Sequence, residues 1–261
     1  MKIDCIHFDL DSVLYLPADF LEAALKLSIK AMIQYGLQAS LAEALNKLEE
    51  IRQQDANASD HFDRLCLSFN GEYDAVIIAA GVEKYWDSKQ GNMMVAPDAH
   101  FVLNRLSQHY QLTVITNGIP VKQAGKLIRL GLCPFFVSFS QEMGASGRYV
   151  YATAVPEQQK PHPYLWEQAK KGLSCSFERS VMVGDRYWAD MFGAKRLGMQ
   201  TVKINQGEHR LETKEEALTK GLGSNPEFAG NRDELLRLME PDYMITNLFE
   251  LLTIVEMIEG G

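Results

Sequence analysis

The sequence lacks the features of a secreted, membrane-spanning or nucleic-acid-binding protein. Its four cysteines lie far apart, with no Cys-x-x-Cys pair and no Cys/His spacing typical of zinc, so we expect reduced thiols in a cytoplasmic protein. No run approaches the roughly 18 continuous apolar residues of a membrane span, and we expect no signal peptide ahead of the first strand. The net charge is −8 and Lys and Arg form no block, which disfavours nucleic acid and anionic membranes as partners.

The length and composition are those of a protein with a full hydrophobic core. The 261 residues exceed one typical domain but fit one α/β core that carries a smaller insertion. Apolar residues make up 46% and charged residues 23%, which supplies enough apolar material for such a core. An anionic small molecule remains a possible ligand, provided that local positive groups overcome the overall repulsion.

The pattern of apolar residues changes near Met93. Before it, no β-branched alternation occurs, and we expect amphipathic helices over 19–35, 40–54, 58–69 and 71–87. The first strand is expected over 3–8. Further strands are expected at 112–116, 135–139, 181–184, 201–204 and 243–245, and helices at 98–109, 120–130, 161–171, 187–197 and 246–258. This alternation predicts a parallel sheet covered on both faces, formed by 1–16 and 92–261, with an all-helical insertion over 17–91 and a surface excursion at 206–240.

Two aspartates end the first predicted strand. Alternation along an extended chain points Asp9 and Asp11 the same way, while Leu10 turns back to the core. Two carboxylates about 4 Å apart repel by roughly 4 kcal/mol at an effective dielectric of 20. Such a pair is stable when it binds a cation, shares a proton or takes part in phosphate chemistry. The simpler alternative is that both aspartates lie in a solvated turn at the end of an ordinary strand.

Polar residues also follow two later strands and begin a helix. Thr116 and Asn117 end one strand at a turn that could cradle an anion or simply cap the next helix. Lys160 lies in Lys-Pro-His-Pro, where two prolines stiffen its backbone before a helix. Asp185 ends a strand and could be a helix N-cap. Asp190 follows in the next helix, where it could face the same cleft as Asp185 or be an ordinary exposed acid.

The order of these groups is more specific than any one of them. Ligands of parallel sheets bind beyond the carboxyl ends of the strands, where all four segments are expected to meet. Four converging carboxylates call for a cation, and hard oxygen ligands favour Mg²⁺. A lysine and a turn of N–H groups beside that ion would supply counter-charges for a phosphoryl group.

Over about 1–16 and 92–205, this constellation resembles the haloacid dehalogenase (HAD) superfamily of phosphohydrolases. The resemblance implies a Rossmann-like, doubly wound core with a helical cap inserted after the first strand. It implies that Asp9 is the nucleophile that forms an aspartyl-phosphate and that Asp11 is the general acid and base. Thr116 and Asn117 would bind phosphate, and Lys160 would steady the nucleophile and the transferring charge. The implied Mg²⁺ ligands are Asp9, the Asp11 carbonyl and Asp185, with Asp190 a ligand or a neighbour of one.

Several alternatives share this fold. A haloacid dehalogenase would lack the second aspartate of the first motif, which Asp11 supplies here, and a phosphomutase shares all the motifs. A non-catalytic binding protein would be expected to lose Asp9, Asp11 or Lys160.

His162 is expected to be solvated or a cap. The cap is expected to decide among small phosphorylated substrates, with candidate residues Arg52, His61, Arg64, Lys84, Tyr85 and Trp86. We expect a monomer or a homodimer.

Overall fold

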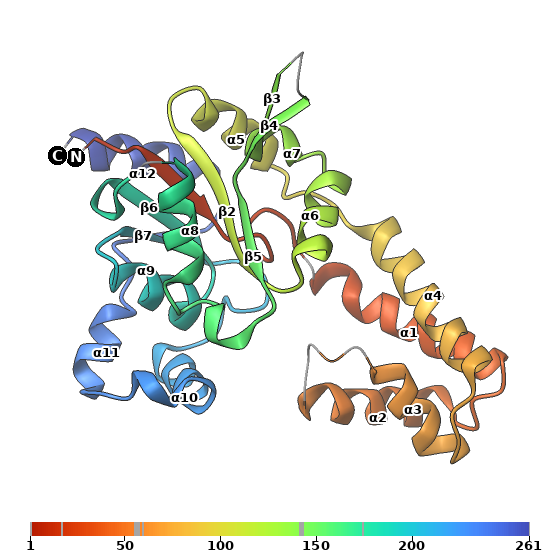
Figure 1. Cartoon of the computed structure of the whole chain (residues 1–261). Coiled ribbons are helices and arrows are strands. Elements are labelled where there is room, and N and C mark those ends of the chain that lie inside the picture. Colours follow the sequence, from red (N-terminus) through yellow and green to blue (C-terminus); the bar gives the residue numbers. More distant parts are fainter. Residues whose placement is uncertain are drawn as a thin grey trace. The chain divides into compact units, whose positions relative to one another are not determined.

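The structure is a computed structural model that describes residues 2–16, 18–54, 58, 60–140, 144–173 and 175–260. The chain forms two compact units, which are described separately: residues 1–16 with 94–261, and residues 17–93 (Figure 1). Among the described helices, none combines the length and apolar character needed to cross a membrane.

The larger unit contains a six-stranded sheet in which every neighbouring pair is parallel, in the order β5-β2-β1-β6-β7-β8. Its strands are β1 (Cys5–Phe8), β2 (Gln111–Asn117), β5 (Val150–Thr153), β6 (Ser180–Gly184), β7 (Gln200–Ile204) and β8 (Tyr243–Ile245). The buried apolar runs of β1 and β6 suit a sheet that is covered on both faces. This is the predicted α/β fold with a doubly wound parallel sheet.

Helices connect these strands (Figure 1). They are α5 (Ala99–Ser107), α6 (Pro120–Arg129), α7 (Cys133–Phe136), α8 (Tyr164–Leu173), α9 (Gly193–Lys195), α10 (Lys214–Ser224), α11 (Arg232–Leu238) and α12 (Phe249–Gly260). Trp166 of α8 and Ala194 of α9 bury their side chains with Met182 of β6 on one face of the sheet. On the other face, Phe136 of α7 packs edge to face with Phe8 of β1 at 6.4 Å.

The strand predicted at 135–139 is wrong in its position. Its first residues belong to α7, and β3 (Val137–Ser140) pairs antiparallel with β4 (Gly144–Arg148) in a separate two-stranded sheet. The neighbour of β2 in the main sheet is β5, which the sequence analysis missed. A short apolar run does not distinguish a buried strand from a buried helical turn, and Pro134 suits the first turn of a helix.

The segment predicted as a helix over 187–197 has an unusual first turn. Residues Tyr187–Phe192 form a π-helix, and α9 follows directly. π-helical turns are rare and often occur at functional sites, because the wider turn changes the direction of a side chain.

The segment 206–240, predicted as a surface excursion, packs against this π-helix. Apolar side chains of α10 and α11 bury with two aromatic residues of the π-helix, and the ring of Trp188 stacks on Phe192 at 4.3 Å. The indole N–H of Trp188 donates to Asn225 Oδ1 at 3.0 Å. The excursion therefore supports the segment that follows β6.

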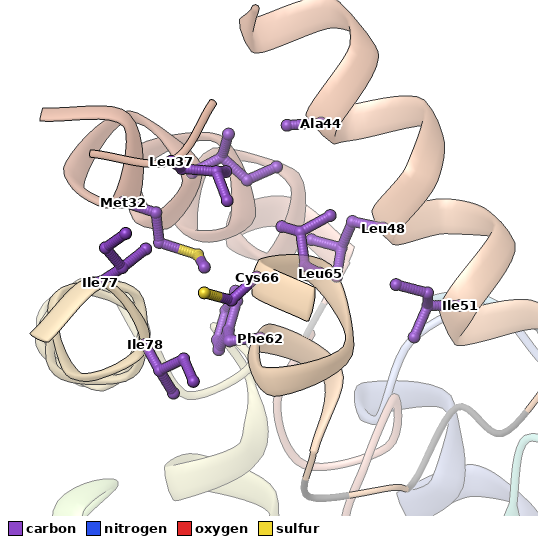
Figure 2. Close-up of a cluster of buried hydrophobic side chains, with 11 residues drawn as sticks. Met32, Leu37, Ala44, Leu48, Ile51, Phe62, Leu65, Cys66, Ile77 and Ile78 are labelled. Atoms are coloured by element: carbon purple, nitrogen blue, oxygen red, sulfur yellow. The ribbon is translucent and has the colours of Figure 1, made fainter. Parts of the chain in front are cut away.

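The smaller unit is all-helical and consists of α1 (Ala18–Gln34), α2 (Leu41–Gln54), α3 (His61–Asn70) and α4 (Ala75–Asn92). Its helices bury one shared cluster of apolar side chains, which includes Leu48 and Leu65 (Figure 2). Helices α1 and α4 pack closely because Gly81 has no side chain, and a Cβ there would lie 2.7 Å from Met32 Cγ. Asp74 caps α4 by accepting from two backbone N–H groups.

Candidate active site

The carboxyl edge of the central strands brings most of the predicted site residues together. Asp9 directly follows β1, and its N–H donates to the Val183 carbonyl of β6 at 2.9 Å. Thr116 is the last residue but one of the neighbouring strand β2, and Asp185 follows β6. The side chains of Asp9, Thr116 and Asp185 are buried, because the sheet order places β1 between β2 and β6.

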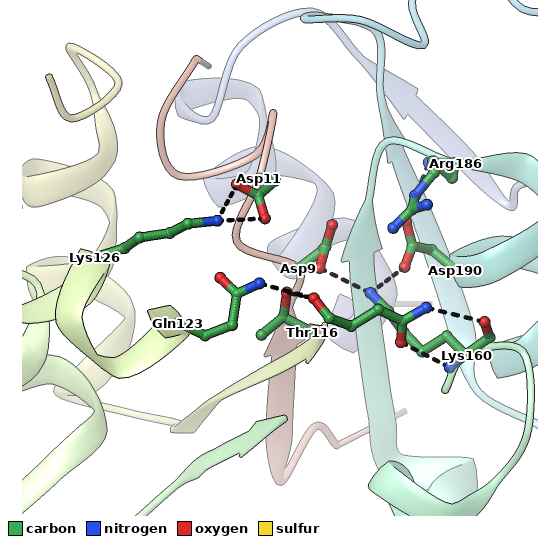
Figure 3. A network of polar contacts seen from close by, with 9 residues as sticks. Asp9, Asp11, Thr116, Gln123, Lys126, Lys160, Arg186 and Asp190 are labelled. Carbon is green, nitrogen blue, oxygen red and sulfur yellow. Dashed lines mark hydrogen bonds and ion pairs between the residues drawn. The ribbon is translucent and has the colours of Figure 1, made fainter. Parts of the chain in front are cut away.

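Lys160 lies at the centre of this group (Figure 3). Its ammonium is 2.8 Å from Asp9 Oδ1 and 2.5 Å from Asp190 Oδ1, and all three side chains are almost fully buried. Burial alone would lower the pKa of Lys160, but the carboxylates of Asp190 and Asp9 hold it above its ordinary value. The ammonium therefore stays charged beside the expected nucleophile.

Asn117, which is expected to bind phosphate, forms two hydrogen bonds with the backbone of Lys160. Its amide donates to the Lys160 carbonyl at 3.1 Å, and the Lys160 N–H donates to Asn117 Oδ1 at 2.8 Å. The N–H of Gly118 in the same turn donates to the Thr153 carbonyl. In this structure these two groups hold Lys160 and β5, whereas the Thr116 hydroxyl makes a long contact of 3.5 Å with the carbonyl of Asn117.

Three aspartates form a candidate metal site. One oxygen each from Asp9, Asp185 and Asp190 lies within 4.8 Å of the others. Within the described part of the chain, Asp9 Oδ2 and Asp185 Oδ2 are buried and have no hydrogen-bond partner. Both oxygens of Asp190 are used, because Oδ1 faces Lys160 and Oδ2 accepts from the Arg186 N–H at 3.1 Å.

The electrostatics of these acids fit a divalent cation. Burial raises the pKa of Asp185 to about 7, and although Arg186 opposes this, Asp190 and Asp9 add to it. Burial would also raise the pKa of Asp190, but Lys160 and Arg186 hold it below its ordinary value. Two unpartnered carboxylate oxygens in a buried site are ligands that Mg²⁺ accepts.

The position of Asp190 depends on a glycine. A Cβ on Gly184 would lie 2.4 Å from the Cβ and Cγ of Asp190, so any other residue at the end of β6 would displace this side chain. The π-helix provides the turn that returns Asp190 to the strand end, since the N–H groups of Asp190 and Met191 both donate to the Arg186 carbonyl.

Asp11 is paired with residues that the sequence analysis did not identify. The ammonium of Lys126 in α6 lies 2.6 and 2.9 Å from its two oxygens (Figure 3), and the Tyr15 hydroxyl also donates to it. Gln123, one turn earlier in α6, donates to the Asn117 carbonyl at 2.8 Å. Gln123 and Lys126 are three residues apart and therefore lie on one face of the helix that follows Thr-Asn-Gly. This spacing is the sequence pattern that could have identified both residues as neighbours of the site.

His162 is neither solvated nor a simple cap. Its side chain is 17% exposed, and Nε2 lies 3.1 Å from Glu227 Oε1. Its ring lies 5.0 Å from that of Phe228. The His162 side chain therefore ties the Lys-Pro-His-Pro segment to the region after α10, which no local sequence pattern indicates.

Comparisons with known proteins agree with this site. The family model described as "HAD-hyrolase-like" matches residues 158–225, which include Lys160, Asp185 and Asp190. A glyceraldehyde 3-phosphate phosphatase of Pyrococcus furiosus is 33% identical over 100% of this chain and 96% of its own length. The same named enzyme of Methanocaldococcus jannaschii is 36% identical over 78% of this chain and 86% of its own.

A solved structure shows the same fold. The HAD-hydrolase YfnB of Bacillus subtilis, solved bound to magnesium, has a TM-score of 0.60 and 20% identity, covering 98% of this chain and 99% of its own. From the two sequence relatives, we conclude that the chain belongs to the HAD superfamily of hydrolases. Within that superfamily it is a phosphatase.

Proposed function

We propose that this phosphatase is a Mg²⁺-dependent enzyme that cleaves a small phosphate monoester through an aspartyl-phosphate on Asp9. The observation that carries the proposal is the environment of the Asp9 carboxylate. Its Oδ1 contacts the Lys160 ammonium, and its Oδ2 is buried without a partner among the described residues. A carboxylate held in this way is oriented and charged, as a nucleophile must be.

The proposed reaction has two steps. In the first, an Asp9 oxygen attacks phosphorus, the ester P–O bond breaks, and Asp11 donates a proton to the leaving oxygen. In the second, Asp11 removes a proton from water, the water oxygen attacks phosphorus, and the bond to Asp9 breaks to release phosphate. Lys160 remains charged throughout and stabilises the negative charge beside Asp9, while Thr116 offers its hydroxyl to the phosphoryl oxygens.

The residues that would hold Mg²⁺ are Asp9 and Asp185 through their unpartnered oxygens, together with the Asp11 carbonyl. The bound ion would neutralise charge on the transferring phosphoryl group. Asp190 is assigned to positioning, because its two oxygens already bind Lys160 and the Arg186 N–H. Its contact with Lys160 keeps the ammonium in place next to the nucleophile.

The names of the relatives suggest the substrate class. Five curated relatives, each 33–36% identical, are named glyceraldehyde 3-phosphate phosphatases, so we propose a short phosphorylated carbonyl or polyol compound as the substrate. We assign the helical unit to the role of a cap domain, because it is inserted directly after the first strand and its Asp-x-Asp motif. The proposal includes a cytoplasmic enzyme that acts as a monomer or a homodimer.

Phosphate release tests this proposal. The purified enzyme is incubated with glyceraldehyde 3-phosphate, and then with other small phosphate monoesters, in Mg²⁺ and in excess EDTA. We expect release in Mg²⁺, loss of release in EDTA, and recovery when Mg²⁺ is added back. Equal release in EDTA would refute the metal dependence, and no release from any monoester would refute the substrate class.

A further inference from the structure

A second cluster of potential metal ligands lies in the larger unit, toward the amino end of β1 and away from Asp9. Cys5 and His7 alternate along β1, so both side chains lie on one face of the sheet. Cys175 comes from the segment between α8 and β6. One ligand atom from each of these three residues lies within 4.8 Å of the others, and all three residues are buried.

The sheet register explains why residues 170 positions apart meet. Cys5 lies opposite Ser180 in the β1–β6 pair, and Cys175 precedes that strand by a short connection. His7 lies opposite Thr113 in the β1–β2 pair, with 2.6 Å between His7 Nδ1 and Thr113 Oγ1. Spacing along the sequence does not reveal this cluster, because β1 and β6 become neighbours only in the folded sheet.

The geometry is close to that of a tetrahedral thiolate site. With Zn–S near 2.3 Å and Zn–N near 2.0 Å, tetrahedral ligands are separated by about 3.8 Å between two sulfurs and about 3.5 Å between sulfur and nitrogen. Cys5 Sγ lies 3.7 Å from His7 Nδ1. The ligand atom of Cys175 lies within 4.8 Å of those of Cys5 and His7. It would therefore have to move inward by about 1 Å at most to reach these tetrahedral separations.

The protonation of these groups also suits a metal. The hydrogen bond with Cys5 lowers the pKa of Cys175 to about 7, although burial opposes it. The same contact, together with burial, raises the pKa of Cys5. His7 is fully buried, and the ring nitrogen that faces Cys5 is Nδ1, whose present partner is the Thr113 hydroxyl. A metal at this site would take the place of that hydroxyl at Nδ1.

We propose that Cys5, His7 and Cys175 bind one thiophilic divalent cation, Zn²⁺ being the natural candidate, at a structural site separate from the aspartate cluster. Binding requires both cysteines as thiolates, so it releases the protons that their thiols carry. The ion would join β1 to the connection that precedes β6. Asp9 follows β1 and Asp185 follows β6, so the ion would link the two strands that position these aspartates. The remaining cysteines are not part of this site, since Cys66 lies in the helical unit and Cys133 begins α7.

Cobalt titration of the reduced, metal-free, full-length protein tests the site. A thiolate bound to Co²⁺ gives a near-ultraviolet charge-transfer band that oxygen ligands do not give, so the aspartate cluster is silent. We expect this band to saturate at one Co²⁺ per chain and to disappear on adding Zn²⁺. Cys175→Ser should lose the band, whereas Cys133→Ser, which removes a half-buried cysteine outside the cluster, should keep it.

Two outcomes would overturn the proposal. One is the absence of a thiolate band in the wild-type protein, and the other is an unchanged band in Cys175→Ser. If Cys175→Ser does not fold, the Cys66→Ala/Cys133→Ser double variant decides, because it retains only Cys5 and Cys175 as possible thiolate ligands and must keep the band. As an independent readout, Zn²⁺ added in saturating Mg²⁺ should raise the Tm of the wild type and of Cys133→Ser.

Discussion

The side-chain amide of Asn117 binds both main-chain hydrogen-bonding groups of Lys160. It donates to the carbonyl at 3.1 Å and accepts from the N–H at 2.8 Å. The Lys160 ammonium in turn lies between Asp9 and Asp190. The placement of the central cation therefore depends on a residue at the end of a different strand, β2.

Replacing this amide should reduce turnover, because the backbone of Lys160 would lose one of its two contacts with Asn117. In Asn117→Asp, a carboxylate oxygen would face the Lys160 carbonyl, so one hydrogen bond is lost and a repulsion takes its place. We expect kcat to fall by about 10–100-fold, equivalent to roughly 1–3 kcal/mol for a buried polar group left unpaired. Asn104→Asp is the control, since Asn104 is exposed on α5. Similar kcat values for the two variants would contradict the assigned role.

Removing the Lys160 charge should affect both activity and stability. Lys160→Met leaves Asp9 and Asp190 as buried carboxylates without their cation, and breaking a buried pair in this way costs about 3–5 kcal/mol. We expect no detectable turnover and a matching loss in the free energy of unfolding by urea. Adding Asp190→Asn should recover part of that stability, because it removes one of the unpaired charges. Strictly additive losses in the double variant would show that the two residues do not interact.

Lys126 is expected to position Asp11. Lys126→Met removes both ion-pair contacts to the Asp11 carboxylate, so among the side chains that the structure describes the hydroxyl of Tyr15 would be the remaining partner of this carboxylate. We expect kcat to fall by about 10-fold, which corresponds to roughly 1.4 kcal/mol, with a smaller change in KM. The matched control is Lys171→Met, on the exposed face of α8. A larger effect on KM than on kcat would instead place Lys126 in substrate binding.

Asp185 should determine the metal requirement. Asp185→Ala removes one of the two buried carboxylate oxygens without a partner among the described residues, so the Mg²⁺ concentration for half-maximal activity should rise at least about 10-fold, as expected when a ligand is lost. Asp233→Ala, an exposed change on α11, should leave the titration unchanged. An unchanged Mg²⁺ titration for Asp185→Ala would exclude Asp185 as a ligand.

The pair of His209 and Glu212 should make stability depend on pH. Burial lowers the pKa of His209, but Glu212 at 3.6 Å and the more distant Asp185 raise it above its ordinary value. The contact with His209 lowers the pKa of Glu212, although burial opposes this. The Glu212 contribution is lost as pH falls through its lowered pKa, and the His209 contribution is lost as pH rises through its raised pKa. Both are present between about pH 4.5 and 6.5.

Urea unfolding of the wild type and His209→Gln checks this window. We expect the wild type to be more stable by up to about 1 kcal/mol near pH 5.5, and the difference to shrink near pH 8.5. The contact of Glu212 with Lys220 is present in both proteins, so it cancels in the comparison. A difference that grows toward pH 8.5 would contradict the predicted sign.

The sequence predicted most of the fold because its signals were local. Gly198 ends the helix before β7 with a positive φ, and buried apolar runs such as Val181–Val183 identify strands. The order of motifs then placed Asp9, Lys160 and Asp185 at one edge. The short strand β5 was missed because Val150–Thr153 is partly exposed at the sheet edge and carries no strong apolar pattern.

What the sequence did not reveal depends on contacts between distant segments. The pairing of Asn117 with Lys160 spans 43 positions, and that of Lys126 with Asp11 spans 115. Neither follows from periodicity, because each requires the register between strands and the direction of a side chain. The packing of α10 and α11 on Trp188 is likewise a tertiary contact, so 206–240 could be identified only as a charged, irregular stretch.

The most direct test of the account is detection of the phosphoryl group on Asp9. Enzyme turning over glyceraldehyde 3-phosphate in Mg²⁺ is quenched in acid and digested, and the peptide that contains Asp9 is analysed by mass spectrometry. We predict an added phosphoryl group on Asp9 that is absent in EDTA and absent in Asp9→Asn. Rapid phosphate release by a folded Asp9→Asn variant, or a phosphoryl group found on another residue, would contradict the central claim.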